Sequence, residues 1–326
     1  MEPLEPTGEA DESLAPARVA AAVAMAERIA ENVRSAVKVR EEMLNHMVVA
    51  LLAEGHILVE DYPGVGKTAL ARALSRSIEC QFARVQCTAD LLPADIVGTN
   101  VYNQREGRFE FRPGPIFANV VIVDEVNRAS PKTQSGLLEC MQERNVTVDA
   151  FSHELARPFM VFATQNPVEY EGTYPLPEAQ VDRFMVRLSL GYPNAADEAG
   201  MLAGHESGDS VLDLEPVTDR AEVLEAVDAA QHVHASRALR DYIVALLRHT
   251  RADGRVELGA SPRAGLLLLR AAKARALIDG RDHALPDDVQ ALADPVLTHR
   301  IMLVPEAAGV ERSAIVADAV AATPAL

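Results

Sequence analysis

The chain has 326 residues, of which 48% are apolar, and a formal net charge of −17. This length suits one large domain or two smaller ones, and the charge argues against a nonspecific nucleic-acid binder, which is normally basic. The acidic N-terminus, the three cysteines without metal-ligand spacing and the lack of an apolar run near the ~20 residues that span a bilayer predict a cytoplasmic protein with no membrane insertion.

Hydrophobic periods indicate alternating strands and helices after an acidic, proline-containing tail. Residues 1–16 are expected to be disordered, and helical patterning runs from 17 to 53. Strands are then predicted at 57–60, 82–87, 120–124, 159–163 and 185–190, with helices at 67–78 and 130–144 between them. This alternation predicts an α/β fold, a parallel sheet with helices on both faces.

Two stretches break the alternation. Residues 88–118 contain too many prolines and glycines for one crossover helix, so an inserted element with strands near 99–103 and 108–111 is expected. In 145–157, alternating valines suggest a small hairpin. After residue 193 the strand signals stop. A helix at 237–251 and another that begins at Ser261 and Pro262 predict a second, all-helical domain over 194–326.

The strongest chemical signal is Gly66-Lys67-Thr68, between a predicted strand and a predicted helix. Lysine occurs only four times in the chain, so one placed directly after a glycine turn suggests a point charge that reaches a phosphate. Thr68 would bind Mg²⁺. The strict phosphate-loop pattern requires glycine where this chain has Asp61. The alternative interpretation is an ordinary turn that leads into a helix.

An apolar strand that ends in Asp124 and Glu125 follows. Asp124 can hold Mg²⁺, through water, and Glu125 can polarise an attacking water. By itself this pair can equally be a solvated strand end.

Three further polar residues follow in chain order. Asn166, after the next strand, can orient a water or contact a γ-phosphate, or belong to a plain Asn-Pro turn. Arg183 is a candidate arginine finger across a subunit boundary, or the partner of Asp182 in a local salt bridge. Arg263 lies at the positive end of a helix, where a cation is unfavourable unless an anion or solvent compensates for it.

Taken together, these motifs resemble the MoxR family of AAA+ ATPases. The resemblance covers about residues 20–305 and is carried by long contiguous segments: Glu60–Thr68, Asp124–Gln134, Leu137–Arg144, Ala163–Phe184 and Gly259–Arg263. It implies a P-loop AAA+ core over 17–193, in which 88–118 is a helix-2 insert and 145–157 a pre-sensor-1 hairpin, followed by an all-α lid over 194–326. Asp61 fits this family, which often lacks glycine there, whereas Ala150 replaces a usual glycine in the hairpin.

The resemblance also implies a role for each matched residue. Lys67 and Thr68 match Walker A, Asp124 and Glu125 Walker B, Asn166 sensor 1 and Arg263 sensor 2. Arg183 lies where the finger is expected, and Arg128 is a candidate for a second arginine acting on a neighbouring subunit. The nucleotide-binding loop comprises Pro63, Gly64, Val65, Gly66, Lys67, Thr68 and Ala69, with Thr68 and Asp124 holding Mg²⁺.

The sequence therefore predicts a Mg²⁺-dependent ATP-hydrolysing motor of chaperone type in a homo-hexameric ring. The resemblance adds partners with von Willebrand A-type domains and protein clients that the motor remodels or activates. Two alternatives stay open: a non-hydrolysing ATP switch or scaffold, and a nucleic-acid motor of the same clade, against which the acidity counts. A GTPase is disfavoured because no Asn-Lys-x-Asp motif occurs.

Overall fold

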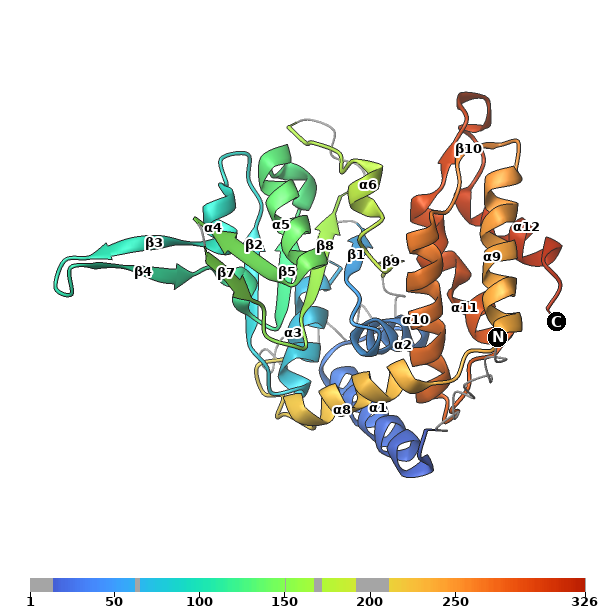
Figure 1. Ribbon diagram of the computed structural model, residues 1–326, viewed down its shortest axis with the longest axis horizontal. Coiled ribbons are helices and arrows are strands. Elements are labelled where there is room, and N and C mark those ends of the chain that lie inside the picture. The colour runs from blue at the N-terminus through green and yellow to red at the C-terminus, as the bar shows by residue number, and fades with distance from the viewer. Residues whose placement is uncertain (1–13, 62–64, 150, 167–171, 192–210, 326) are drawn as a thin grey trace, which may run out of the picture.

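A five-stranded parallel sheet forms the centre of the protein (Figure 1). The computed structural model describes residues 14–61, 65–149, 151–166, 172–191 and 211–325. In spatial order the strands are β2 (Phe82–Gln86), β5 (Val120–Asp124), β8 (Met160–Gln165), β1 (Ile57–Glu60) and β9 (Val186–Leu188). All four pairings are parallel. The predicted α/β fold is confirmed.

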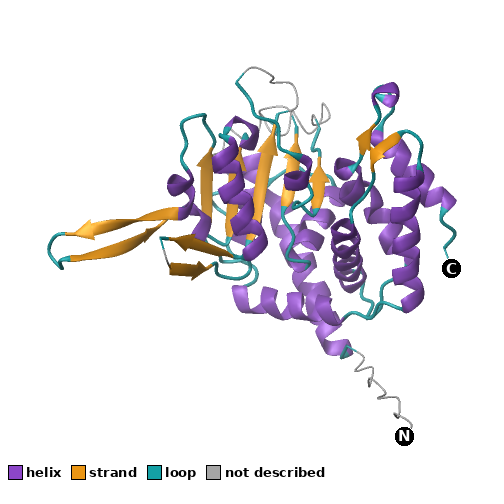
Figure 2. Ribbon diagram, turned by 45° about the horizontal axis from the view of Figure 1, so that its top comes forward, coloured by secondary structure: helices purple, strands orange, loops and turns teal. Residues whose placement is uncertain are grey.

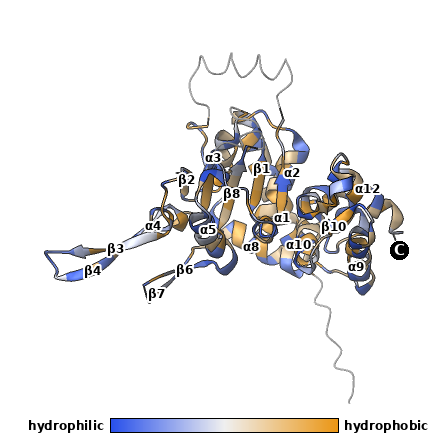
Figure 3. Cartoon of the chain, turned by 90° about the horizontal axis from the view of Figure 1, so that it is seen from above, coloured by the Kyte–Doolittle hydropathy of each residue, from blue (hydrophilic) through white to orange (hydrophobic). Residues whose placement is uncertain are grey.

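The three central strands, β1, β5 and β8, are buried on both faces, because their alternate side chains enter two separate apolar clusters. Ile57 and Ile122 pack with α1 (Pro16–Ala36), α2 (Glu41–Leu52) and α3 (Lys67–Ser77). Leu58 and Val121 point the other way, into a cluster with α4 (Pro93–Val97) and α5 (Pro131–Glu143). Figure 2 shows helices on both sides of the strands, and Figure 3 shows apolar colours along β1 and β8.

The N-terminal helix begins inside the predicted tail. α1 starts at Pro16, which suits the first helical position because its missing N–H needs no partner there. Leu14 is buried in the core. The disordered tail predicted for 1–16 is therefore too long at its C-terminal end, while residues 1–13 lie outside the described part.

Two antiparallel hairpins leave the sheet on one side (Figure 1). The longer joins β3 (Gly98–Asn103) to β4 (Arg108–Pro113) and is followed by a 3₁₀ turn, Pro115–Phe117. The shorter joins β6 (Asn145–Val148) to β7 (Phe151–Glu154). The Phe111 ring stacks on the His153 ring with 4.0 Å between centroids, so the hairpins pack against each other at their bases. Ala150, which replaces a usual glycine of this hairpin, lies outside the described residues.

The C-terminal part is mainly helical. It comprises α8 (Arg220–His232), α9 (Arg237–Ala252), α10 (Pro262–Ile278), α11 (Pro286–Leu297) and α12 (Arg312–Ala322). The sequence missed a two-stranded ribbon, β10 (Val256–Leu258) with β11 (Met302–Leu303), because such short strands leave no detectable period. The predicted division at residues 193 and 194 falls outside the described residues.

The helix α8 packs against both α1 and α10, so a continuous apolar cluster runs from the N-terminal helices into the lid. Among the helices described here, none combines the length and the apolar character needed to cross a bilayer.

Candidate functional site

The phosphate loop joins the end of β1 to the start of α3. Gly66 has a φ of +87°, a left-handed conformation that glycine adopts without strain, and Lys67 is the first residue of α3. The first N–H groups of a helix lack intrahelical partners, so the backbone from Lys67 onward offers donors to an anion. Val65, Thr68 and Ala69 are also described, whereas Pro63 and Gly64 fall in the undescribed segment 62–64.

The Lys67 ammonium lies close to three acids. Its Nζ donates a hydrogen bond to the backbone oxygen of Asp61 at 2.9 Å. Burial lowers the pKa of Lys67, and the negative charges of Asp61, Asp124 and Glu125 oppose that shift. The lysine is thus near the acidic pair that ends β5, as a phosphate and metal site requires.

Asp61, the residue that breaks the strict loop pattern, has a definite structural role. It is 4% exposed, and its Oδ2 accepts a hydrogen bond from the Gly191 N–H at 2.9 Å. The Ser189 hydroxyl lies 3.5 Å from the same oxygen. Asp61 therefore fastens the beginning of the phosphate loop to the chain that leaves β9, a contact that a glycine would lack.

The acidic pair is oriented by neighbouring strands. Asp124 is 7% exposed, and its Oδ2 accepts from Arg84 Nε of β2 at 2.7 Å. Its Oδ1 accepts from the Thr164 hydroxyl of β8 at 3.3 Å. The same Thr164 oxygen accepts the Glu125 N–H at 2.9 Å. Thr164 thus aligns both acids at once.

Glu125 has a strained backbone and a tethered side chain. Its φ of +54° is unusual for a residue with a side chain. Its Oε2 accepts from Arg128 Nη1 at 2.9 Å and from Gln86 Nε2 at 3.0 Å. Arg128, a candidate for contact with a neighbouring subunit, is paired within its own chain here.

Asn166 lies at the same edge of the sheet. It follows β8 directly, is 8% exposed, and its backbone oxygen is 3.5 Å from Asn127 Nδ2. Since β8 lies between β5 and β1, the ends of these parallel strands bring Asn166 beside the acidic pair and the phosphate loop. We call this the carboxyl edge, and the opposite one, where the strands begin, the amino edge.

Arg183 and Arg263 lie at the amino edge. Arg183 comes just before β9, and nearby Met185 donates its N–H to the oxygen of His56, the residue ahead of β1 (2.8 Å). Arg263 Nη1 is 3.4 Å from Gln142 Oε1, at the end of α5. That end of α5 is fixed to the start of β1 by the ion pair of Arg144 with Glu54 at 2.8 Å.

The two arginines form a pair of like charges. Burial lowers the pKa of Arg183, the charge of Arg263 lowers it further, and Glu139 and Glu143 oppose the shift. The Arg183 Nε is buried and has no hydrogen-bond partner within the described residues. An anion shared by both guanidinium groups would satisfy the donor and relieve the repulsion.

The structure therefore divides the predicted site residues between two edges. Lys67, Thr68, Asp124, Glu125 and Asn166 meet at the carboxyl edge. Arg183 and Arg263 lie about a strand's length away, which is roughly 13 Å for the four residues of β1 at about 3.3 Å per residue. Within a single chain, Arg263 therefore lies apart from the phosphate loop and the acidic pair. Sequence reasoning also missed Arg84 and Thr164, which carry no local motif.

Comparison with known proteins agrees with this geometry. Residues 56–186 match the model of the ATPase family associated with various cellular activities (AAA), and residues 248–319 match that of the AAA lid domain. The chain is similar along 95% of its length to a solved structure of an ATPase candidate from Cytophaga hutchinsonii. That chain is 97% covered, with 36% sequence identity and a TM-score of 0.89.

Relatives from several bacteria match most of the chain. The uncharacterised protein YeaC of Bacillus subtilis is 50% identical over 84% of this chain and 87% of its own. Chaperone MoxR1 of Mycobacterium tuberculosis is 38% identical over 87% of this chain and 78% of its own. Protein MoxR of Methylorubrum extorquens is 33% identical over 86% of this chain and 88% of its own.

The role of Asp61 can be tested by restoring the glycine of the strict pattern. Asp61→Gly should lower the melting temperature by several degrees, because hydrogen bonds to a buried charged group contribute about 1.5–3 kcal/mol each. Asp61→Asn keeps an acceptor oxygen and should lose less. Thermal unfolding followed by circular dichroism measures both. A glycine variant as stable as the wild type would show that the carboxylate is not an anchor.

Proposed function

The chain belongs to the MoxR family of AAA+ ATPases, and from this premise we propose that it hydrolyses ATP with Mg²⁺ at the boundary between two copies of itself. The observation that carries the proposal is the separation of the site into two edges. The carboxyl edge offers a phosphate loop and an acidic pair but lacks the two arginines. The amino edge presents Arg183 and Arg263 without a phosphate loop of its own. One chain placed head to tail on the next would complete the site.

At the carboxyl edge the chain binds and orients the substrate. Lys67 and the N–H groups that follow it hold the β- and γ-phosphates, together with Pro63 to Gly66. Thr68 and Asp124 would hold Mg²⁺. Their hydroxyl and carboxylate oxygens suit this ion, which usually keeps waters and substrate phosphates as its other ligands. Bound there, Mg²⁺ neutralises charge on the phosphates.

Glu125 activates the attacking water and Asn166 positions it. Arg128 and Gln86 both donate to Oε2 of Glu125, which orients the carboxylate so that its Oε1 can accept the proton of the water. Thr164 accepts the Glu125 N–H and so keeps the Glu125 backbone in place.

Arg183 and Arg263 stabilise the transferred phosphoryl group in the neighbouring chain. Charge develops on the γ-phosphate oxygens in the transition state, where preorganised guanidinium donors are most effective. A head-to-tail contact that repeats by rotation closes into a ring. The family resemblance makes a homo-hexamer our proposal.

The use of the ATP is proposed from the family. One relative is named a chaperone, and we place this chain with the MoxR proteins that remodel or activate client proteins alongside von Willebrand A-type domain partners. Nucleic acid is not among the proposed partners, given the net charge of −17. All three cysteines are free thiols, which suits the proposed cytoplasmic location.

Glu125→Gln tests the proposed hydrolysis. The variant should bind ATP as the wild type does, while kcat falls at least a hundredfold because the amide cannot accept a proton. Phosphate release and ATP titration measure the two effects. Affinity capture with this variant and ATP should retain a protein client. Wild-type hydrolysis in the variant would refute the role of Glu125, and ATP binding without any hydrolysis in the wild type would support the switch alternative.

Mixing variants tests the shared site. Arg183→Ala should lower kcat by about 10³-fold or more, as loss of an arginine finger does, and leave ATP affinity unchanged. Equal amounts of Arg183→Ala and Glu125→Gln should regain activity, because some boundaries then combine an intact acidic pair with an intact arginine. Full activity of Arg183→Ala alone, or no recovery on mixing, would contradict the proposal.

Thr164→Val tests the alignment of the acidic pair. The substitution keeps the size of the side chain and removes both hydrogen bonds, so kcat should fall at least tenfold, because each bond contributes about 1 kcal/mol and ~1.4 kcal/mol is a factor of ten. Thr164→Ser restores the hydroxyl and should recover most of the rate. Equal rates for the valine and serine variants would show that the hydroxyl does not matter.

A further inference from the structure

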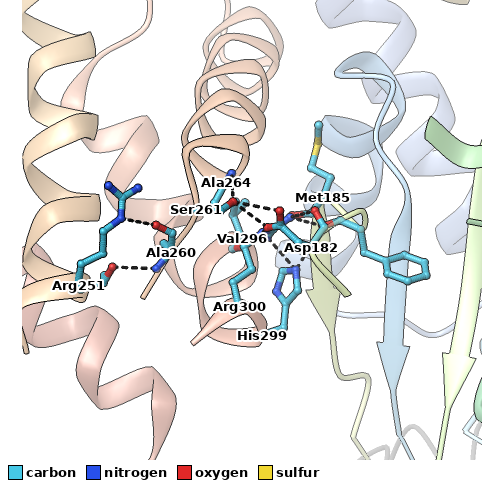
Figure 4. Close-up of polar contacts among 11 residues, drawn as sticks. Asp182, Met185, Arg251, Ala260, Ser261, Ala264, Val296, His299 and Arg300 are labelled. Carbon is cyan, nitrogen blue, oxygen red and sulfur yellow. Dashed lines mark hydrogen bonds and ion pairs between the residues drawn. The ribbon is translucent and has the colours of Figure 1, made fainter. Parts of the chain in front are cut away.

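A buried arginine of the lid reaches into the segment that carries Arg183. Arg300 ends the 3₁₀ turn Thr298–Arg300, and its side chain is 2% exposed. Its Nε donates to Asp182 Oδ1 at 2.8 Å. Its Nη groups donate to backbone oxygens of Asp182 at 3.2 Å, Met185 at 3.4 Å and Phe184. Figure 4 shows this fan of contacts, which encloses the backbone on both sides of Arg183.

The same carboxylate holds the start of the helix that carries Arg263. The Ser261 hydroxyl lies 3.1 and 3.0 Å from the two carboxylate oxygens of Asp182. Ser261 is also the N-cap of α10 and accepts the Ala264 N–H at 3.1 Å. Asp182 therefore links Arg300 to the first turn of α10. Arg300 contacts the backbone on both sides of Arg183, and Ser261 caps the helix that carries Arg263.

The lid fixes Ser261 from its other side. Arg251 Nε donates to the Ala260 oxygen at 2.7 Å, and the Ala260 N–H donates to Thr250 Oγ1 at 3.1 Å. Both contacts come from α9 (Figure 4). Helix α9 of the lid thus holds Ala260, while Asp182 of the core holds the hydroxyl of Ser261. The lid and the core together therefore set the position of Arg263.

Burying these charges is a costly way to join two packed surfaces. Desolvation lowers the pKa of Arg300 to about 10, although Asp182 opposes the shift. Well-packed apolar residues stabilise an interface at least as well as a buried ion pair. Only a planar guanidinium, however, directs several donors at fixed angles onto one short stretch of backbone. The arrangement thus favours geometric definition over stability.

We propose that Arg300 is a positioning residue for catalysis: together with Asp182 and Ser261 it fixes the spacing and orientation of Arg183 relative to Arg263, so that both reach the phosphates bound by the neighbouring chain. The inference rests on the proposed function, in which the arginine pair acts across the subunit boundary. It assigns the seam between lid and core a part in the reaction of the next subunit.

The test uses the full chain with Arg300→Met. Methionine fills the buried site with an apolar side chain of similar length and removes the guanidinium donors. We expect kcat to fall tenfold to a hundredfold, since small misplacements of a reacting group have effects of that order. ATP affinity should stay within twofold, because the variant's own carboxyl edge is intact. Arg300→Lys should recover little, because an ammonium cannot reproduce the fan of contacts.

Mixing separates positioning from general damage. Equal amounts of Arg300→Met and Glu125→Gln should regain hydrolysis, since about a quarter of the boundaries in a randomly mixed ring pair an intact acidic pair with an intact arginine seam. Arg281→Met is the matched control. Arg281 pairs with Asp288, which is 2% exposed, at 2.6 Å within the lid. Its loss should lower the melting temperature and leave kcat unchanged.

The possible outcomes distinguish failure of this inference from failure of the proposed function. Wild-type kcat in Arg300→Met, beside a large loss in Arg183→Ala, would overturn this inference and leave the proposed function standing. Unchanged kcat in Arg183→Ala would instead refute the proposed function. Failure to recover on mixing, or an equal kcat loss in Arg281→Met, would reduce Arg300 to a stability role. If Arg300→Met does not fold, Ser261→Ala must show a kcat loss that mixing reverses, and wild-type kcat there would overturn the inference.

Discussion

Parallel pairing of all five strands gives the sheet two chemically different edges. Polar residues that follow apolar strands gather where the strands end, and in this chain they are Lys67, Asp124 and Asn166. Residues that precede strands gather at the other edge, as Arg183 does. The length of the strands keeps the two sets apart within one chain. An ATP site that requires both sets is therefore an intermolecular site, whatever the details of its chemistry.

An ion pair orients a carboxylate at each edge, half-exposed Arg84 with Asp124 and buried Arg300 with Asp182, and both pairs serve orientation more than stability. Arg84 and Thr164 hold the two oxygens of Asp124 in fixed directions. Arg300 and Ser261 do the same for Asp182. Removing the charges from water costs about as much as the attraction between them returns. What such pairs provide is a defined geometry, and the proposed hydrolysis depends on geometry at both edges.

The sequence was sufficient for features that are local. A strand that ends in Asp124 and Glu125, or a glycine before Lys67, is visible within a few residues. Its limits appear with contacts between distant positions. Thr164 aligns Asp124 from 40 positions away, and Arg300 meets Asp182 across 118. Asp61 is an example, because in the sequence it is only a departure from the glycine of the strict phosphate-loop pattern. Its function depends on Gly191, which only the fold brings near.

The contacts of Asp182 with Arg300 and Ser261 join the lid to the amino edge, which is proposed to face the ATP of the neighbouring chain. Arg300 and His299 come from the lid, and burial together with the charge of Arg300 keeps the pKa of His299 well below its ordinary value. The ring is therefore neutral near pH 7, and its Nε2 lies 2.7 Å from Arg300 Nη1 and 3.2 Å from the Phe184 backbone oxygen. No titration near neutral pH loosens this contact. In a ring built as proposed, a movement of the lid would thus be transmitted through Asp182 to Arg183 and so to the ATP of the next chain.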